Sequence, residues 1–383
     1  MKKIFFFILL TIGLSTITLA QAQDSTKNAG LRFSLLTCDA GKDLYTIWGH
    51  TALRVTDSIN HTDIVYNYGS FDFNEPNFIA KFLKGDLRYF ISADTYQNFL
   101  YEYEYFGRDV HEQILNISAI EKQQWQQDLL LNMIGDNRFY LYNFITDNCT
   151  TRIKDGLFKH SQLNNNSIHI QSFRAEVVEA PYKGGLPWVG LGIDLLLGAV
   201  ADKKPNLFQE AFLPALLFNK LALNKQLVSY TGHVKYNQQV VEKSLSPIFI
   251  LLLVLAIYFF ASNWNSYFTQ KVATILDISF LTVLGLGGLL VFYMSQISLH
   301  TACHENYNLL WLHPLYLLAL PIYFISNKWT GILGWIFFAI IILLMLSSYW
   351  IPQYFSNSTL VLMTIALFLN MRLIKRGRYA QYQ

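Results

Sequence analysis

The sequence contains few cysteines and no spacing that would pair them or bind a metal. Cys38, Cys149 and Cys303 are widely separated in 383 residues, and no CxxC motif occurs. Because an odd number of cysteines cannot all pair within one chain, at least one free thiol is expected. The spacing therefore indicates neither a redox motif nor a metal site.

Charge is also scarce, and the two signs nearly balance. Asp, Glu, Lys and Arg make up 14% of the chain and leave a formal net charge of +3, with the basic residues dispersed. A nucleic-acid partner needs a concentrated basic surface. We therefore expect no nucleic-acid partner.

Charged residues are rarest after Pro247, where Leu, Ile, Phe, Tyr and Trp dominate. A membrane-spanning helix needs about 20 mainly apolar residues. Five stretches approach or exceed that length, and the first and last of them are short. We predict spans at Pro247–Ser262, Ile275–Ser298, Leu309–Ser326, Trp329–Trp350 and Ser356–Asn370.

The positions of Lys and Arg predict the orientation of these spans. If the first half of the chain lies outside, the loops with Lys271 and Lys328 and the basic tail 373–383 face the cytoplasm. The two outer loops, 299–308 and 351–355, then contain no Lys or Arg. This arrangement obeys the positive-inside rule and predicts a cytoplasmic C-terminus.

The N-terminus has the pattern of a secretory signal peptide, although an uncleaved anchor is an alternative. Lys2 and Lys3 precede an apolar core, and Ala20 to Ala22 form an A-x-A cleavage site. We expect a signal peptide (1–22), an exported catalytic domain (23–180), an interfacial amphipathic linker (181–245), a transmembrane domain (246–372) and a basic cytoplasmic tail (373–383).

Cys149 occupies a position suited to a nucleophile. A β-rich run ends at Asp147 and Asn148, two preferred N-cap residue types, so a helix is expected to begin at Cys149. The unpaired N–H groups of a first helical turn favour a thiolate and can also hold an oxyanion. The structural alternatives are a small buried cysteine or a disulfide with Cys38. For Asp147 we expect helix capping before a catalytic role.

His50, in the extended run Tyr45–Thr56, is the expected partner of Cys149. A Cys–His pair generates a thiolate and then moves protons to the leaving group and from the attacking group. A structural histidine is the alternative. Asn67 or Asp63 on the next extended run can orient the imidazole, and strand alternation alone does not choose between them.

Six motifs in this sequence are specific when taken together. They are WGHTALRV (Trp48–Val55), YNYGSFDF (Tyr66–Phe73), KFLKGDLRY (Lys81–Tyr89), EQILNIS (Glu112–Ser118), YNFITDNCTTRIKD (Tyr142–Asp155) and NYNLLWLHPL (Asn306–Leu315). Together they resemble the Lnb type of bacterial lipoprotein N-acyltransferase. The order of a histidine strand before a cysteine helix also resembles permuted papain-like (NlpC/P60-like) folds. The resemblance implies an α+β permuted papain-like exported domain followed by an all-α bundle of five transmembrane helices.

The resemblance also implies a reaction. Cys149 would take an acyl chain from a membrane phospholipid, and the resulting thioester would acylate the α-amino group of a diacylglyceryl-cysteine lipoprotein. His50 would move the protons, and neither a metal nor an organic cofactor would be required. The protein would be a multi-pass inner-membrane protein with its catalytic domain in the periplasm. A membrane-tethered cysteine peptidase or amidase acting on cell-wall peptide and a non-enzymatic scaffold are the alternatives.

The outer loop after the second span offers candidate substrate contacts. His304, Asn308 and Trp311 lie on the side expected to face the exported domain, so we expect them to contact the lipid head group or acceptor. His300 and His304 have an i, i+4 spacing that suits a metal on a helix, but no third ligand is evident. The apolar linker segments are expected either to roof a lipid path or to pack as core.

Overall fold

The computed structural model of the chain describes residues 30–161, 166–236, 244–325 and 327–379. The predicted signal peptide lies outside these residues and stays a prediction. The chain forms two compact units, which we call the sheet unit and the helical unit. The sheet unit contains Met1–Glu75, Arg88–His169 and Asn206–Gln239, and the helical unit contains Pro76–Leu87, Ile170–Pro205 and Val240–Gln383.

An antiparallel sheet of seven strands, in the order β6-β4-β3-β2-β1-β5-β7, forms the sheet unit. β1 lies near its centre, and Phe33, Leu35 and Leu36 on this strand are fully buried because helices cover the sheet. The strands are β1 (Leu31–Cys38), β2 (His50–Asp57), β3 (Thr62–Ser70), β4 (Arg88–Thr95), β5 (Val110–Leu115), β6 (Phe139–Leu141) and β7 (Val228–Val234).

Four helices longer than one turn complete the described part of the sheet unit. Helix α5 packs on β2 and β3 through Ile153 and Leu157, both nearly fully buried. Gly156 lets α5 approach α4 closely, because a Cβ there would lie 2.7 Å from Trp125 Nε1. The helices are α3 (Tyr96–Tyr105), α4 (Ala119–Asn132), α5 (Cys149–His160) and α8 (Pro214–Ala222).

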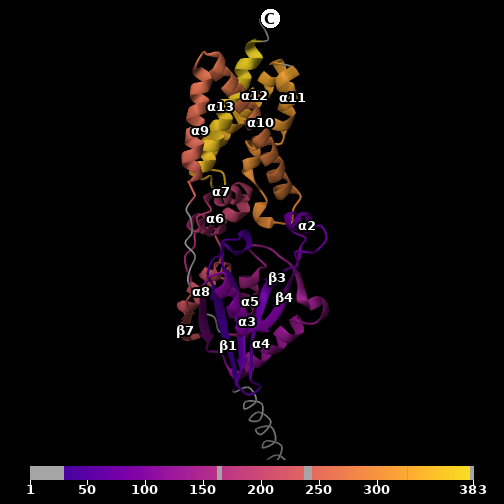
Figure 1. Cartoon of the computed structure of the whole chain (residues 1–383), viewed down its shortest axis with the longest axis vertical. Helices are drawn as coiled ribbons and strands as arrows, with labels where there is room; N and C mark the ends of the chain where they lie inside the picture. Colours follow the sequence, from indigo (N-terminus) through magenta and orange to yellow (C-terminus); the bar gives the residue numbers. More distant parts are fainter. Residues whose placement is uncertain (1–29, 162–165, 237–243, 326, 380–383) are drawn as a thin grey trace, which may run out of the picture. The chain divides into compact units, whose positions relative to one another are not determined.

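In the part of the helical unit that the structure describes, the apolar helices α9 to α13 run side by side (Figure 1), and the helical unit also contains α2, α6 and α7. Each predicted span overlaps one of the five. Four helical segments are long and apolar enough to cross a membrane, whereas α9, at 17 residues, is shorter. A fifth span therefore stays a prediction. The helices are α2 (Phe78–Lys84), α6 (Phe173–Lys183), α7 (Pro187–Leu196), α9 (Pro247–Asn263), α10 (Tyr267–Gln296), α11 (Leu315–Ile325), α12 (Asn327–Ser347) and α13 (Asn357–Tyr379).

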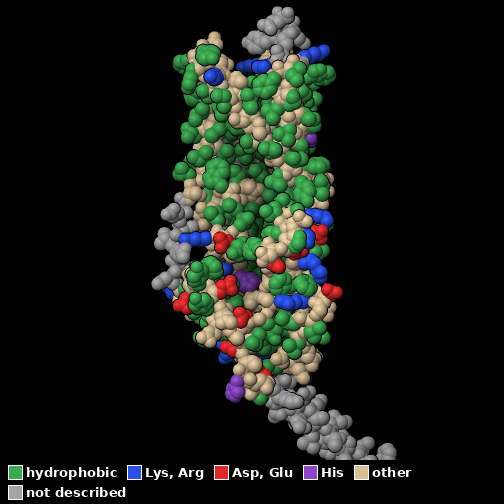
Figure 2. Space-filling view, turned by 45° about the vertical axis from the view of Figure 1, so that its right-hand side comes forward, with side chains coloured by type: hydrophobic (Ala, Val, Ile, Leu, Met, Phe, Trp, Pro, Cys, Tyr) green, Lys and Arg blue, Asp and Glu red, His purple; other side chains and the backbone are tan. Residues whose placement is uncertain are grey.

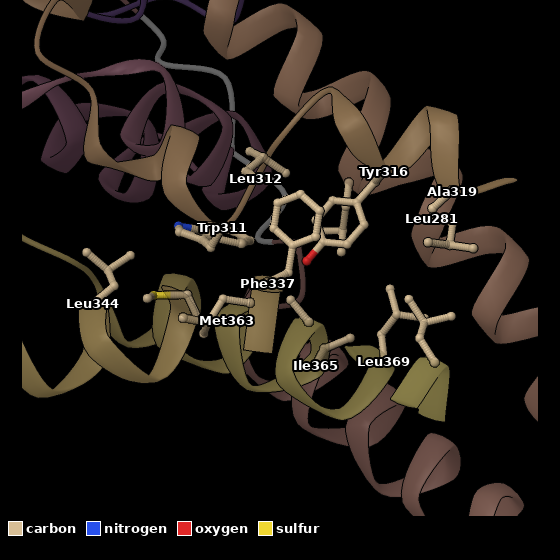
Figure 3. Packing of buried hydrophobic residues seen from close by; sticks show 14 of the residues in the cluster. Leu281, Trp311, Leu312, Tyr316, Ala319, Phe337, Leu344, Met363, Ile365 and Leu369 are labelled. Atoms are coloured by element: carbon tan, nitrogen blue, oxygen red, sulfur yellow. The ribbon is translucent and has the colours of Figure 1, made fainter. Parts of the chain in front are cut away.

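Aromatic packing and buried hydrogen bonds hold the helical unit together. Figure 3 shows Trp311 and Tyr316 facing Phe337 and Met363, and the rings of Tyr316 and Phe337 stack at 4.4 Å. Asn370 Nδ2 donates to the Tyr316 hydroxyl at 2.8 Å. Lipid tails are as apolar as leucine, so close packing and hydrogen bonds between helices are what associate them in a bilayer.

The residues expected to form a separate linker, 181–245, are divided between the two units. Residues up to Pro205 belong to the helical unit, and Asn206–Gln239 belong to the sheet unit. Within the latter segment, β7 pairs with β5 and forms one edge of the sheet. β7 is largely exposed, so it lacks the apolar alternation by which a strand is recognised in sequence.

Candidate active site

Cys149 is the first residue of α5, and Asn148 caps this helix. The Asn148 side chain accepts a hydrogen bond from Thr151 N at 2.9 Å, and Asn148 N donates to Thr151 Oγ1 at 2.7 Å. The capping residue is thus Asn148, and the expectation that Asp147 caps the helix is wrong. Because this cap engages Thr151 N, the first-turn N–H groups that remain without an intrahelical acceptor are those of Cys149 and Thr150. These two groups lie next to the thiol.

His50 opens β2 and contacts both Cys149 and Asn67. Its Nε2 lies 3.2 Å from Asn67 Oδ1 on β3, and its ring is close enough to the Cys149 thiol for each group to shift the pKa of the other. In the tautomer in which Nε2–H donates to Asn67, Nδ1 has a free lone pair that can accept the thiol proton. Gly49 precedes His50 with φ +79°, and a Cβ there would lie 2.5 Å from the carbonyl oxygen of Cys38. Glycine is therefore required where the chain turns to present His50.

The surroundings of Cys149 favour the thiolate. Burial opposes ionisation, but the charge and hydrogen bond of His50 outweigh it, and with Thr51 N–H and the Thr150 hydroxyl they lower the pKa of the Cys149 thiol below its usual value. Burial likewise opposes the charged imidazole, but the neighbouring sulfur and the Asn67 hydrogen bond raise the pKa of His50. Both shifts favour a thiolate–imidazolium pair.

The other two cysteines have no such environment. Burial raises the pKa of the Cys38 thiol to about 12, and it raises the pKa of the Cys303 thiol to about 12 as well. All three cysteines are free, so the disulfide between Cys38 and Cys149 does not form in this structure. A thiol with its pKa near 12 stays protonated and unreactive at neutral pH. Only Cys149 of the three has a lowered pKa.

Tyr140, a residue that sequence reasoning missed, presents an unpaired hydroxyl beside Cys149. It lies on β6 with 7% of its surface exposed, and its hydroxyl has no hydrogen-bond partner among the described residues. A Cβ on Gly69 of β3 would lie 3.6 Å from Cys149 Cβ and 4.0 Å from the Tyr140 hydroxyl, so all three residues meet. Burial and the nearby sulfur raise the pKa of Tyr140, which keeps its hydroxyl protonated and able to donate.

An unsatisfied buried hydroxyl costs about 1–3 kcal/mol, so the hydroxyl of Tyr140 needs an explanation. Arg152 holds the Tyr140 ring in place from its other side, with its guanidinium 3.9 Å from the ring centroid. No sequence signal distinguishes Tyr140 from its neighbour Tyr142, because both lie in the same aromatic run.

Two carboxylates considered at the sequence level bind arginines instead of His50. Asp63 accepts from Arg54 at 2.6 and 2.8 Å. Asp147 accepts from Arg152 at 2.6 and 2.8 Å. Of the two candidates for orienting the imidazole, the structure therefore brings Asn67 to His50. A catalytic role for Asp147 stays a prediction.

The three predicted substrate contacts of the helical unit take part in hydrogen bonds within that unit. Asn308 accepts from Trp311 Nε1 at 3.0 Å and donates to the carbonyl of Leu195 at 3.0 Å, and both Asn308 and Trp311 are buried. The His304 ring lies 3.0 Å from the carbonyl oxygen of Ser298. These bonds tie the outer loop to α7 and to the end of α10. A substrate role for the three residues stays a prediction.

In the part of the chain that the structure describes, no group of three or more His, Cys, Asp or Glu side chains could hold a metal ion. The i, i+4 pair His300 and His304 binds backbone carbonyls instead. Nε2 of His300 lies 2.8 Å from the carbonyl oxygen of Phe82. The spacing alone was thus a weak signal.

Comparison with known families also divides the chain into two parts. Residues 18–178 match the Lnb N-terminal periplasmic domain, and residues 239–379 match the Lnb transmembrane domain. The class is thus a periplasmic domain joined to transmembrane helices, which suggests a multi-pass protein of the inner membrane. The chain belongs to the Lnb family, as its motifs predicted, and the family suggests a function of the lipoprotein N-acyltransferase type. Neither the curated proteins nor the solved structures gave a match.

Proposed function

We propose that this protein transfers an acyl chain from a membrane phospholipid, through a thioester on Cys149, to the α-amino group of a diacylglyceryl-cysteine lipoprotein. The observation that carries this proposal is the contact chain from Cys149 through His50 to Asn67. It lies in a protein that has both Lnb domains. The nucleophile, the base and the group that orients the base are thus assembled in a chain that both lipid substrates can reach.

In the first half-reaction, the Cys149 thiolate attacks the ester carbonyl of a phospholipid. A bond from sulfur to the acyl carbon forms, and the bond to the glycerol oxygen breaks as His50 protonates that oxygen. The oxyanion of the tetrahedral intermediate accepts hydrogen bonds from Cys149 N–H and from the Tyr140 hydroxyl. The products are an acyl-thioester and a lysophospholipid.

In the second half-reaction, the lipoprotein amine attacks the thioester carbonyl. His50, now neutral, accepts a proton from the amine, the carbon–sulfur bond breaks, and the thiolate re-forms as the amide is released. An α-amino group has a pKa near ~8, so a useful fraction of the acceptor is neutral at physiological pH. Asn67 keeps the imidazole in one orientation throughout. Two steps through one covalent intermediate predict ping-pong kinetics.

The membrane topology proposed from the charge pattern has structural support. Leu299 N, beyond the end of α10, donates to the carbonyl of Lys84 at 2.7 Å, and Lys84 lies within the stretch matched as periplasmic. Thr359 near the start of α13 donates to Asp194 at 3.3 Å. These contacts support a periplasmic end of α10, five spans that include α9, and a cytoplasmic C-terminus. In Figure 2 hydrophobic side chains cover most of the transmembrane helices, and Lys and Arg gather where the last helix ends.

The proposal is tested with Cys149→Ala in cells that depend on this protein for lipoprotein maturation. Mass spectrometry of the lipoprotein N-terminal peptide should show the diacylated form only, and the matched control Cys38→Ala should show the triacylated form. In purified wild-type protein, a mass increase of one acyl chain on Cys149 is expected with phospholipid alone. Persistence of triacylated lipoprotein in Cys149→Ala contradicts the proposal. Cleavage of cell-wall peptide by the wild type without any acyl adduct would favour the amidase alternative.

A further inference from the structure

Helix α2 carries its apolar and basic side chains on opposite sides. Successive residues of an α-helix are about 100° apart, so four apolar side chains of α2 fall within an arc of about 140° and its two lysines fall on the other side. Two of the apolar side chains are well exposed, Ile79 by 72% and Phe82 by 42%. The apolar side chains are Phe78, Ile79, Phe82 and Leu83, and the lysines are Lys81 and Lys84.

The helical unit holds α2 at the end of a membrane-spanning helix. Leu299 N donates to the carbonyl of Lys84 at 2.7 Å, and the His300 ring lies 2.8 Å from the carbonyl oxygen of Phe82. Gly85 ends α2 with φ +76°, and a Cβ there would lie 3.2 Å from Leu299 Cβ. Leu299 is three residues beyond α10, which is long and apolar enough to span a membrane. The α2 helix is therefore fixed at the level where α10 leaves the bilayer.

The exposed apolar surface continues from α2 onto the chain that leaves α10. Ile297 is 53% exposed and Leu299 is 50% exposed. Exposed apolar side chains next to the end of a spanning helix lie at the depth where acyl chains meet head groups. An amphipathic helix at that depth places its apolar side toward the acyl chains and its lysines toward phosphate groups.

We propose that α2 is a membrane-contacting helix that lies in the periplasmic surface of the bilayer, with Ile79 and Phe82 in contact with phospholipid acyl chains. The occupant of this surface is lipid, because the surface is continuous with the exposed apolar residues Ile297 and Leu299 at the end of the transmembrane helix α10. The apolar side chains of α2 contribute more to this contact than its lysines do, because Lys84 already forms an ion pair with Asp86 at 2.8 Å. The inference rests on the transmembrane assignment of α10 and not on the chemistry at Cys149.

The connection that contains α2 runs from β3 to β4, and β3 carries Asn67 and Gly69. The chain that orients His50 thus leads directly into the lipid-contacting helix. Under the proposed function, contact with lipid by α2 raises the apparent affinity for phospholipid donors without entering the chemistry of acyl transfer.

The contact is tested on the full chain in nanodiscs of phosphatidylethanolamine and phosphatidylglycerol. A nitroxide is attached at Ile79→Cys in a Cys149→Ser background, in which the remaining Cys38 and Cys303 are buried. Power saturation should show high access to oxygen and low access to a water-soluble nickel chelate, as at the control Leu252→Cys on α9. Ile59→Cys on the β2–β3 turn should show the reverse. Nickel access at Ile79 equal to that at Ile59, or spin–spin broadening from a second copy, overturns the proposal.

The functional arm uses the double variant Ile79→Ser/Phe82→Ser and the matched control Ile59→Ser/Ile120→Ser, whose residues are exposed apolar side chains of the sheet unit. Acyl transfer from nanodisc phospholipid should show a several-fold higher apparent KM for lipid in the first variant only. Acylation of Cys149 by a soluble nitrophenyl ester should be unchanged in both. An unchanged KM, or equal loss with both donors, contradicts the lipid contact. If the wild type acylates Cys149 with neither donor, the proposed function fails instead.

Discussion

Two buried polar residues, Arg174 in the helical unit and Tyr140 in the sheet unit, differ in how far their hydrogen-bonding groups are satisfied. In the helical unit, Arg174 donates to both carboxylate oxygens of Asp202, to one carboxylate oxygen of Asp194 and to three backbone carbonyls, and its side chain is 3% exposed. In the sheet unit, the buried hydroxyl of Tyr140 has no hydrogen-bond partner in the described ranges, and it lies near Cys149. A saturated polar network fixes a structure, whereas an unsatisfied donor is available to a ligand.

The comparison separates a residue that stabilises the fold, Arg174, from a residue that is proposed to take part in the reaction, Tyr140. Removing one partner of a buried, saturated ion pair leaves a charge without compensation and costs stability. Removing a donor that has no partner in the resting protein costs little stability and appears only in the rate. Substitutions of these two kinds of residue should therefore affect different measurements, the free energy of unfolding for the first kind and the reaction rate for the second.

His50→Ala should produce the largest effect. General acid–base catalysis contributes up to about 10⁴-fold, and His50 also stabilises the thiolate. The rate of Cys149 acylation should fall by about that factor while thermal unfolding changes little. Single-turnover mass spectrometry measures the rate, with His61→Ala on the exposed β2–β3 turn as the control. A loss smaller than tenfold would show that another group serves as the base.

Arg174→Met should affect stability instead. Breaking a buried ion pair by removing one partner costs about 3–5 kcal/mol, and here Asp194 and Asp202 both lose their partner. Denaturant unfolding in detergent should show this loss, whereas the rate per folded molecule should be unchanged. Lys183→Met removes an exposed pair with Glu179 and serves as the control. If the two variants have equal free energies of unfolding, the stabilising role assigned to Arg174 is wrong.

Tyr140→Phe should lower the reaction rate without lowering the stability, the opposite of Arg174→Met. Loss of one oxyanion donor costs about 10²–10³-fold in kcat, and stability should stay equal or rise because an unsatisfied hydroxyl is removed. Tyr68→Phe is the control, since the Tyr68 hydroxyl already accepts from Asn132 at 2.9 Å. If Tyr140→Phe unfolds more readily and keeps its kcat, Tyr140 is a structural residue.

The smallest expected effect is a shift in the pH dependence of Cys149 acylation. Cys149 acylation should rise as pH passes the lowered pKa of Cys149 and fall as pH passes the raised pKa of His50, because the leaving oxygen then loses its proton donor. The Asn67 hydrogen bond contributes to raising the pKa of His50, so Asn67→Ala should move the high-pH limb to lower pH. Rate profiles of the two proteins measure this shift. A limb that stays in place would mean that Asn67 only supports the strand.

Local signals in the sequence were sufficient for part of the site. The N-cap pattern before Cys149 and the β-run that contains His50 both depend on neighbouring residues. The helix begins at Cys149 as predicted. The run predicted over Tyr45–Thr56 is a strand only from His50 on, because Leu44–Thr46 form a 3-10 helix before it. Strand alternation left Asn67 and Asp63 open, because the choice depends on Arg54, which takes Asp63. The change in composition near Pro247 predicted an exported part followed by a transmembrane part, and the two family matches agree with that division.

Long-range contacts account for what the sequence did not reveal. Tyr140 is distinguished only by its position across from Gly69, which lies 71 residues earlier in the numbering. The segments 76–87 and 170–205 belong to the helical unit through contacts with distant loops, such as the bond from Gly198 N to the carbonyl of Ala302 at 2.9 Å. Neither a hydrophobic period nor a turn signal encodes such partners.

Neither unit is made from one continuous piece of chain. The polypeptide passes from one unit to the other after Glu75, after Leu87, after His169, after Pro205 and after Gln239. A protease cut or a stop codon just before the first predicted span would give a fragment that still contains segments 76–87 and 170–205. Both segments belong to the helical unit, most of which the fragment lacks. During synthesis, α2 is made long before the loop that binds it, so the exported part must wait for membrane insertion before its fold is finished. A soluble version suitable for crystallisation would need both segments replaced by short linkers.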